Sequence, residues 1–304
     1  MADALTRNGP QAEGRLIKQS EGRLVKQDEF KHAFVVGHPI SHSRSPLLHG
    51  LWLQQHGIDG AYTAQDIAPD DLSAFFARIR HSEFIGGNIT LPHKEAALEL
   101  VDAVDETARR LGAINTVWMQ DNLLYGTNTD GEGFLANLDD RHPSWDAPAR
   151  LRAGALVLGA GGASRAIVMG LKERGFQRVT VANRTVERAQ TIADEFGAPV
   201  EAASMADVEG GTEHGLIVNT TSLGMGGEGL PIEPSHFPRT TLVTDAVYTP
   251  LMTPLLLAAK AHGQPTVDGL GMLLHQAVPG FEKWFGVRPQ VTEKVRQTIL
   301  GTMR

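Results

Sequence analysis

Length, composition and charge already exclude several classes of protein. The chain has 304 residues, no cysteine and a formal net charge of −7, so it cannot be held by disulfides, use thiol catalysis or bind metals through thiolates. Its acidic balance offers no broad basic face for nucleic acid, although a few placed arginines could hold an anionic cofactor, and its length suits two domains.

The first 30 residues are polar and contain a near-repeat, EGRLIKQ at 13–19 and EGRLVKQ at 21–27. The segment is too short and too polar to form a core, which predicts a surface extension over 1–30. Its start lacks the apolar stretch of a signal peptide, and no later run approaches the ~20 apolar residues that span a bilayer. We therefore expect a cytoplasmic protein that binds no membrane.

Residues 31–130 alternate short apolar strands with helix-like stretches, which predicts an α/β domain with a mainly parallel sheet. Residues 115–130 predict two strands about a tight Asp-Asn turn. The other expected elements are strands at 33–37, 61–67 and 84–90 and helices at 46–57, 70–80 and 93–100.

A second alternation follows the linker at 141–152 and predicts a further α/β domain over 131–268. The run ALVLG at 155–159 is continuously apolar, as in a central parallel strand covered on both faces. The last segment, 269–304, predicts two helices. We expect them to return to the first domain, which would otherwise lack a covering layer.

The sequence ALVLGAGGASRA predicts a dinucleotide site, because glycines at 159, 161 and 162 connect a buried strand to a helix. Glycines let the backbone approach a pyrophosphate, and the helix N-terminus offers hydrogen-bond donors. Ser164 replaces the third glycine of the GxGxxG pattern. Such a loop also serves ordinary close packing, an alternative that the loop alone leaves open.

The end of the next expected strand indicates which dinucleotide would bind. An NAD site usually has an acidic residue there, but this chain has Asn183, Arg184 and Thr185. A guanidinium favours a 2′-phosphate, hence NADP, and Arg188 one turn further could contact the same phosphate. The alternative is that both arginines are solvent-exposed residues at a helix start.

Polar residues also gather at element ends in the first domain. Ser45 is a good N-cap before Pro46, and together with Ser43 it could cradle a carboxylate. Lys94 lies at the start of the expected helix, where partial positive charge disfavours a cation. A residue that breaks a local rule without local benefit is often functional.

Asn88, Thr90, Asn115 and Asp130 lie at or near the ends of expected strands. Taken alone, Asn88 and Asn115 are typical turn formers and Asp130 is a typical N-cap. Together with the cofactor loop they resemble a family. The motifs SHSRSP, NITLPHK, GAINT, NTDGEGF, GAGGASRA, NRT, NTTSLGM and DGLGMLLHQA occur in the order and spacing of shikimate dehydrogenases. The resemblance extends from about residue 33 to the C-terminus.

This resemblance implies NADP-dependent, reversible reduction of 3-dehydroshikimate to shikimate, in the route to chorismate and the aromatic amino acids. It implies a substrate domain made from both ends of the chain, an inserted Rossmann domain and an active site between them. Lys94 would be the catalytic acid-base and Asp130 its partner. The implied substrate residues are Ser43 and Ser45 for the carboxylate, Asn88, Thr90, Asn115, Asp130 and Gln276 for the ring hydroxyls, and Tyr248.

The implied cofactor residues fall into three groups. Ala246 and Gly269 would lie near the nicotinamide, and Glu106 is a further candidate. The remaining matches are Gly159, Ala160, Gly161, Gly162, Ala163, Asn183, Arg184, Thr185 and Arg188.

Chemistry gives Lys94 a role, because hydride transfer to a ketone leaves negative charge on oxygen and requires a proton donor within reach. We expect no catalytic metal, since the 12 histidines show no HExxH-type spacing. Two alternatives stay open: a quinate or mixed quinate/shikimate dehydrogenase, and a non-catalytic NADPH-binding protein of the same fold. The presence of both Lys94 and Asp130 argues against the second. A monomer and a homodimer are both compatible with the sequence.

Overall fold

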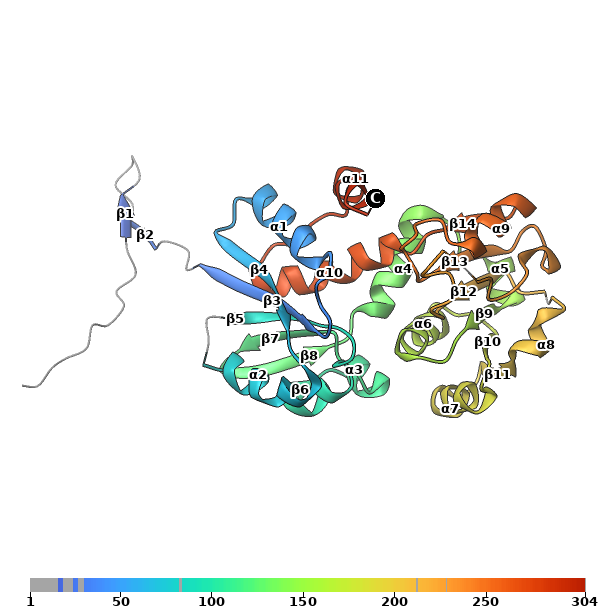
Figure 1. The fold of residues 1–304 in the computed structure, drawn as a ribbon, viewed down its shortest axis with the longest axis horizontal. Coiled ribbons are helices and arrows are strands. Elements are labelled where there is room, and N and C mark those ends of the chain that lie inside the picture. The colour runs from blue at the N-terminus through green and yellow to red at the C-terminus, as the bar shows by residue number, and fades with distance from the viewer. Residues whose placement is uncertain are drawn as a thin grey trace, which may run out of the picture.

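The protein forms two sheets, each with its own helices, arranged side by side (Figure 1). The computed structural model describes residues 30–81, 84–211, 213–227 and 229–303, together with two short paired strands, β1 (Leu16–Lys18) and β2 (Leu24–Lys26). Apart from these strands and residue 30, the expected extension at 1–30 lies outside the described residues.

The first sheet has six strands in the order β4-β3-β5-β7-β8-β6. Pairings β4–β3, β3–β5 and β8–β6 are parallel, whereas β5–β7 and β7–β8 are antiparallel, so a hairpin interrupts the parallel arrangement. Asp121 and Asn122 have φ of 51° and 62°, the turn expected between β7 and β8. The strands are β3 (Lys31–Gly37), β4 (Gly60–Asp66), β5 (Phe84–Ile89), β6 (Ala103–Val104), β7 (Thr116–Gln120) and β8 (Leu123–Thr127).

Both faces of this sheet are covered, and side chains alternate between them along β3. Ala33 and Val35 pack under α1 (Ser45–His56), α10 (Leu270–Phe285) and α11 (Glu293–Gly301). Phe34 and Val36 pack on the other face. That second face is covered by α2 (Leu72–Ile79), η2 (Ala96–Leu100) and α3 (Glu106–Leu111), and the short helix η1 (Pro69–Asp71) precedes α2. The two C-terminal helices therefore form part of the first domain's core.

The second sheet is parallel throughout, in the order β11-β10-β9-β12-β13-β14. This is the 3-2-1-4-5-6 order of dinucleotide-binding folds. The strands are β9 (Ala155–Leu158), β10 (Val179–Asn183), β11 (Val200–Ser204), β12 (Leu216–Asn219), β13 (Leu242–Asp245) and β14 (Thr266–Val267). Its helices are α5 (Pro148–Ala153), α6 (Gly162–Glu173), α7 (Val186–Phe196), α8 (Met205–Glu209), η3 (Pro234–His236) and α9 (Pro254–His262).

Helix α4 (Asp130–Arg141) lies between the two domains and packs on both α10 and α6 (Figure 1). Glycines permit these close contacts. A Cβ added at Gly133 would lie 2.6 Å from the Cβ of Gln276, and one added at Gly131 would lie 2.8 Å from the carbonyl oxygen of Ala166. Because α4 begins at Asp130, this packing also fixes the position of that carboxylate.

Three expectations about helix starts are wrong. Ser45 is the first residue of α1, after an N-cap at Arg44. Asp130 is likewise the first residue of α4, after an N-cap at Thr129. Residues 93–100 form turns and then the short 3₁₀ helix η2, because the carbonyl oxygen of Lys94 accepts a hydrogen bond from the N–H of Ile114 and is not available to a helical ladder. Lys94 therefore does not lie in the first turn of an α-helix.

Within the described residues, no helix combines the length and the apolar character that a membrane span requires.

Candidate active site

A cavity of about 560 Å³ lies where the two domains meet. Its walls come from the β3–α1 loop, the end of β5, the start of α4 and helix α10, and from the start of α6 and the loop after β13. All nine residues expected to bind substrate line it: Ser43, Ser45, Asn88, Thr90, Lys94, Asn115, Asp130, Tyr248 and Gln276. Three expected cofactor residues line the same cavity: Ala163, Ala246 and Gly269.

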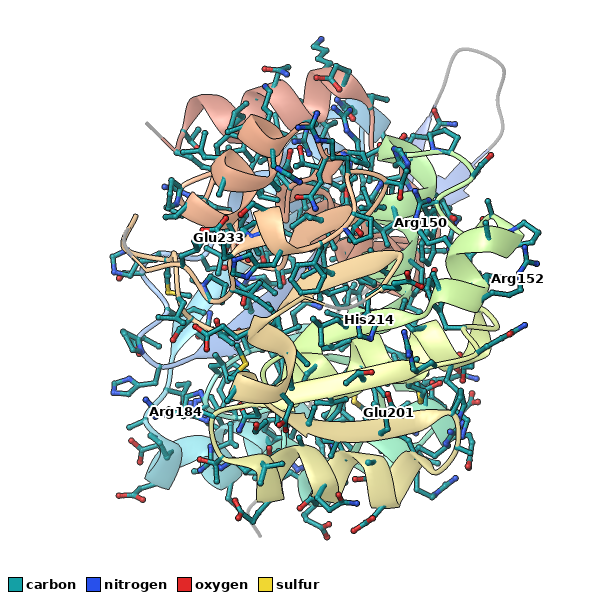
Figure 2. The ribbon with its side chains drawn as sticks, turned by 90° about the vertical axis from the view of Figure 1, so that its right-hand side faces the viewer. Arg150, Arg152, Arg184, Glu201, His214 and Glu233 are labelled. Carbon is teal, nitrogen blue, oxygen red and sulfur yellow. The ribbon has the colours of Figure 1, made fainter. Side chains whose placement is uncertain are left out.

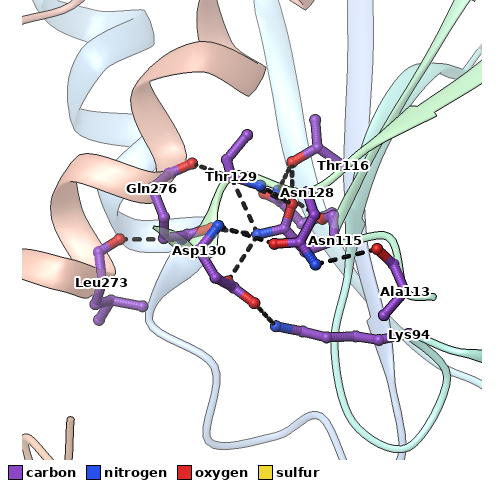
Figure 3. Close-up of polar contacts among 10 residues, drawn as sticks. Lys94, Ala113, Asn115, Thr116, Asn128, Thr129, Asp130, Leu273 and Gln276 are labelled. Atoms are coloured by element: carbon purple, nitrogen blue, oxygen red, sulfur yellow. Dashed lines mark hydrogen bonds and ion pairs between the residues drawn. The ribbon is translucent and has the colours of Figure 1, made fainter. Parts of the chain in front are cut away.

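Lys94 and Asp130 form an ion pair inside this cavity, with 2.5 Å between Nζ and Oδ2 (Figure 3). Their side chains are 25% and 10% exposed, so the pair is largely shielded from water but still reachable. The position of Asp130 in the first turn of α4 suits a carboxylate, because the helix N-terminus carries partial positive charge.

Asn115 fixes the other oxygen of that carboxylate. Its Nδ2 donates to Asp130 Oδ1 at 2.8 Å, and its Oδ1 accepts from the N–H of Thr129 at 2.9 Å (Figure 3). The same Nδ2 lies 3.4 Å from Gln276 Oε1, and Thr129 Oγ1 donates to the carbonyl oxygen of Gln276 at 2.8 Å. The network thus joins the start of β7 and the start of α4 to α10, and it holds the pair of Lys94 and Asp130 in one orientation.

The side chain of Asn88 is oriented by Tyr62, a residue that the sequence analysis did not identify as a candidate. The Tyr62 hydroxyl donates to Asn88 Oδ1 at 2.6 Å, and Asn88 Nδ2 donates to Thr116 Oγ1 and to the carbonyl oxygen of Asn115, both at 3.1 Å. Burial raises the pKa of Tyr62 well above its ordinary value, so the hydroxyl stays protonated and remains a donor. The orientation of the Asn88 amide is therefore set by the protein.

Arg44 is a second residue that sequence reasoning missed, although it stands between the two serines of SHSRSP. It is half-buried, lines the cavity and has no ion-pair partner among the residues that the structure describes. Burial raises the pKa of Tyr248 on the facing wall, and the positive charge of Arg44 opposes that shift. Asp130 neutralises the charge of Lys94. Among the described residues, Arg44 therefore supplies a positive charge without an ion-pair partner to the part of the cavity lined by Ser43 and Ser45.

The glycine loop is open to a ligand. Gly159 has φ of 105°, which favours glycine, and it turns the chain from β9 toward α6. A Cβ added at Gly161 or Gly162 would meet no atom within 4 Å, and both residues are exposed. The backbone at these two glycines is not closely packed. The alternative that the glycine loop serves only close packing therefore does not fit Gly161 and Gly162.

The end of β10 lies beside this loop, because β9 and β10 are neighbours in the sheet. Arg184 and Arg188 are exposed, and neither has an ion-pair partner in the described part of the chain. Figure 2 shows Arg184 at the opposite end of the strands of the second sheet from Arg150 and Arg152, which precede β9. Two free guanidinium groups next to a bare glycine turn fit a dinucleotide that carries an extra phosphate.

The remaining cofactor candidates are placed as follows. Ala160 lies in the glycine turn, and Asn183 ends β10 and donates to the carbonyl oxygen of Thr185 at 2.8 Å. Glu106, at the start of α3, is exposed, forms an ion pair with Arg109 at 2.8 Å and does not line the cavity. Like Arg184 and Arg188, Glu106 therefore lies outside the cavity that Ala163, Ala246 and Gly269 line.

A second cavity, of about 750 Å³, is lined by other residues of α4, α6 and α10. It contains none of the residues that the sequence predicts for substrate or cofactor.

A parallel sheet in dinucleotide-binding order, a bare glycine turn and an amine–carboxylate pair in a polar cavity define the class of NAD(P)-dependent oxidoreductases. Three family models match the chain: "Shikimate dehydrogenase substrate binding domain" at 35–117, "Shikimate / quinate 5-dehydrogenase" at 148–222 and "Shikimate 5'-dehydrogenase C-terminal domain" at 269–300. The chain belongs to the shikimate dehydrogenase family, as its motifs predict.

Relatives and solved structures agree with this placement. The chain is 55% identical to a shikimate dehydrogenase (NADP(+)) of Mesorhizobium japonicum over 90% of its own length and 97% of the relative. The Thermus thermophilus shikimate 5-dehydrogenase, solved with NADP(H) and shikimate, is 37% identical with a TM-score of 0.79 over 90% of this chain and all of that one. A quinate dehydrogenase from Corynebacterium glutamicum, solved with NAD, is 32% identical with a TM-score of 0.81, over 90% of this chain and 99% of that one.

Proposed function

We propose that the protein is an NADP-dependent shikimate dehydrogenase that reversibly reduces 3-dehydroshikimate to shikimate, in the route to chorismate and the aromatic amino acids. One observation carries the proposal. The ion pair of Lys94 and Asp130 lies in a cavity that is also lined by Ala163 and Ala246 of the dinucleotide-binding domain. A proton donor for the carbonyl oxygen and a hydride carrier for the carbonyl carbon can therefore reach the same carbonyl group.

In this reaction NADPH supplies the hydride when bound, and the chain supplies the proton. Lys94 donates a proton to the carbonyl oxygen during reduction and accepts it from the hydroxyl during oxidation. Asp130 accepts a hydrogen bond from Lys94 and keeps the ammonium group directed at the reacting oxygen. Asn115 keeps the carboxylate in place through its second oxygen.

The substrate would lie with its carboxylate at one end of the cavity and its ring hydroxyls at the other. Ser43 and Ser45, with the positive charge of Arg44 between them, suit the carboxylate. Tyr248 closes this end. The residues proposed for the hydroxyls are Asn88, Thr90, Asn115, Asp130 and Gln276.

The proposed cofactor site follows the carboxyl edge of the second sheet. The backbone from Gly159 to Ala163 would hold the pyrophosphate, since Gly161 and Gly162 are exposed at the N-terminus of α6. Asn183, Arg184, Thr185 and Arg188 would hold the ribose and its 2′-phosphate. Ala246 and Gly269 would lie beside the nicotinamide. Glu106 stays a further candidate for the cofactor.

The domain limits remain a proposal as well: 31–130 with 269–304 for substrate, and 131–268 for NADP. The shared core of β3, α1, α10 and α11 supports the union of the two chain ends. A cytoplasmic location and a monomeric or homodimeric state stay predictions, and the second can be checked by sedimentation.

A quinate dehydrogenase is the second candidate, because one of the similar structures has that activity and binds NAD. A single absorbance assay separates the possibilities. We expect 3-dehydroshikimate to be reduced rapidly with NADPH and much more slowly with NADH. We also expect quinate to reduce NAD only slowly. A faster reaction of quinate with NAD would favour the second candidate, and no turnover with any pair would favour a non-catalytic relative.

A further inference from the structure

A buried ion pair connects the C-terminal helix to the edge of the cavity. Arg296 of α11 donates through Nη2 to Oδ2 of Asp268, at 2.6 Å, and the two side chains are only 6% and 17% exposed. Asp268 lies in the turn between β14 and α10, immediately before Gly269. Arg296 itself does not line the cavity.

The turn at Asp268 is held from three directions. Arg296 contacts one carboxylate oxygen, and the N–H of Leu270 donates to the other at 3.1 Å. Asn137 of α4 donates through Nδ2 to the Asp268 carbonyl oxygen at 2.8 Å. The side chain from α11 is therefore part of what sets the position of this turn.

Gly269, the next residue, packs directly on the nicotinamide side of the proposed site. A Cβ added there would lie 2.5 Å from the carbonyl oxygen of Asp245 and 2.8 Å from those of Ala246 and Val247. Gly269 and Ala246 both line the cavity. Because there is no room for even a methyl group between Gly269 and these carbonyl oxygens, we expect a shift of the turn to move the wall that Ala246 and Gly269 form.

A contribution to folding stability does not by itself explain the buried pair of Arg296 and Asp268. Removing two charges from water costs free energy that their attraction often fails to recover, and a well-packed apolar pair can replace a buried ion pair. Moreover, Nη1 of Arg296 is buried without a hydrogen-bond partner in the described chain. What the pair supplies that apolar residues cannot is a directional contact on the carboxylate of Asp268.

We propose that Arg296 is a positioning residue that acts through Asp268 to hold Gly269 against Ala246, and so fixes the wall beside the nicotinamide. The inference rests on the proposed function for the identity of that wall. It concerns geometry at a distance, because the guanidinium group of Arg296 touches neither proposed ligand.

The test compares Arg296→Met, Asp268→Asn and their double variant with wild type. Glu293→Gln is the matched control, since it removes the exposed ion pair with Arg141 from the same helix α11. Each variant is assayed for kcat and KM, for the kinetic isotope effect with NADPH deuterated at the transferred position, and for NADPH affinity by nucleotide fluorescence. Arg296→Lys, which keeps the charge, provides a milder change should Arg296→Met not fold.

We expect Arg296→Met and Asp268→Asn each to lower kcat by roughly 10- to 100-fold, as for a small misplacement of reacting groups, and to raise the isotope effect and the Kd of NADPH. The double variant should be no worse than the poorer single variant, because the two residues act as one unit. Arg296→Lys should recover part of the loss, and Glu293→Gln should resemble wild type.

The inference would be overturned if Arg296→Met and Asp268→Asn lowered only the melting temperature. In that case the kinetic constants, the isotope effect and the NADPH affinity would all stay within twofold of wild type. Strictly additive losses in the double variant would also overturn it. Failure of the proposed function looks different: wild type itself would then not consume NADPH with 3-dehydroshikimate, and NADPH affinity would still test the role of Arg296.

Discussion

At the scale of single residues, the central feature is the convergence of two groups that lie 36 positions apart in the chain. Lys94 follows β5 and Asp130 begins α4, yet Nζ and Oδ2 are 2.5 Å apart. Asp130 is held by Asn115 on one side and by Lys94 on the other, so the lysine has a defined direction. The proposed role of this lysine as proton donor leads to a direct test.

Lys94→Ala should lower kcat by roughly 10²- to 10⁴-fold, as expected for loss of general acid-base catalysis. Ser43→Ala is the companion change, because a carboxylate contact outside the reacting centre should act mainly on the KM for shikimate. Steady-state kinetics of both variants with shikimate and NADP separate the two roles. Turnover close to normal in Lys94→Ala would remove this lysine from the mechanism.

Arg184 offers a second test at this scale, because its guanidinium is exposed and has no ion-pair partner among the described residues. Arg184→Gln should raise the KM for NADP about 10- to 100-fold, as for loss of a hydrogen bond to a charged group, and should leave the KM for NAD nearly unchanged. Arg152→Gln, an exposed arginine before the amino end of the sheet, is the control (Figure 2). Equal losses with NADP and NAD would mean that Arg184 does not contact the 2′-phosphate.

At the scale of elements, the junction of β9 and α6 decides how a dinucleotide can approach. Gly159 makes the turn with a positive φ, and Gly161 and Gly162 leave the backbone open. The two loops at the carboxyl ends of β9 and β10 then lie side by side, because these strands pair in parallel register. The glycine turn and the arginines are therefore presented at one edge of the sheet.

Gly161→Ala should weaken NADP binding without unfolding the protein. Its φ of −111° is open to alanine, and the new methyl group would meet no protein atom within 4 Å, so it would project into the proposed path of the pyrophosphate. Gly50→Ala in α1 is a matched control, since that methyl group is equally unobstructed and should add about 0.5–1 kcal/mol of stability. The measurements are thermal melting and NADPH fluorescence titration. Unchanged NADPH affinity in Gly161→Ala would contradict the proposed cofactor path.

At the scale of the whole molecule, the first domain contains a buried histidine that makes its stability depend on pH. His49 is fully buried and stacks on Tyr62 with 4.0 Å between ring centres. Burial lowers the pKa of His49 to about 3, and the neighbouring Asn88 opposes the shift only in part. Folding and proton binding at His49 therefore oppose each other.

The sign of the pH effect follows from linkage. Between the folded pKa of about 3 and the ordinary value of 6.5, the unfolded chain binds a proton that the folded chain does not, so stability falls as pH falls below 6.5. When the pH is lowered from 7 to 5, His49 should reduce the free energy of unfolding by about 2 kcal/mol. Urea midpoints at the two pH values measure this loss.

His49→Phe keeps an aromatic ring in the stack and should reduce the difference between the two midpoints. His56→Gln, at the exposed end of the same helix, should leave it unchanged. An undiminished difference in His49→Phe would assign the acid sensitivity to other groups, of which buried His214, whose pKa burial lowers to about 4, is the next candidate.

Local patterns in the sequence determined much of this protein. The strand and helix alternation, the Asp121–Asn122 turn, the glycine loop and the arginine after β10 are short-range features, because propensity, turn geometry and periodicity act over a few residues. The family motifs added the choice of candidate site residues. These were enough to predict the two-domain α/β fold, the family and the cofactor.

Tertiary contacts decided the rest. Lys94 left the expected helix because Ile114, 20 positions on, takes its carbonyl oxygen. Tyr62 behind Asn88, Arg44 facing Tyr248, and Arg296 on Asp268 are contacts between distant segments, and no local pattern encodes them. The direction of a buried polar group is set by whichever donors and acceptors the folded chain brings to it, so these roles exist only once the domains have packed.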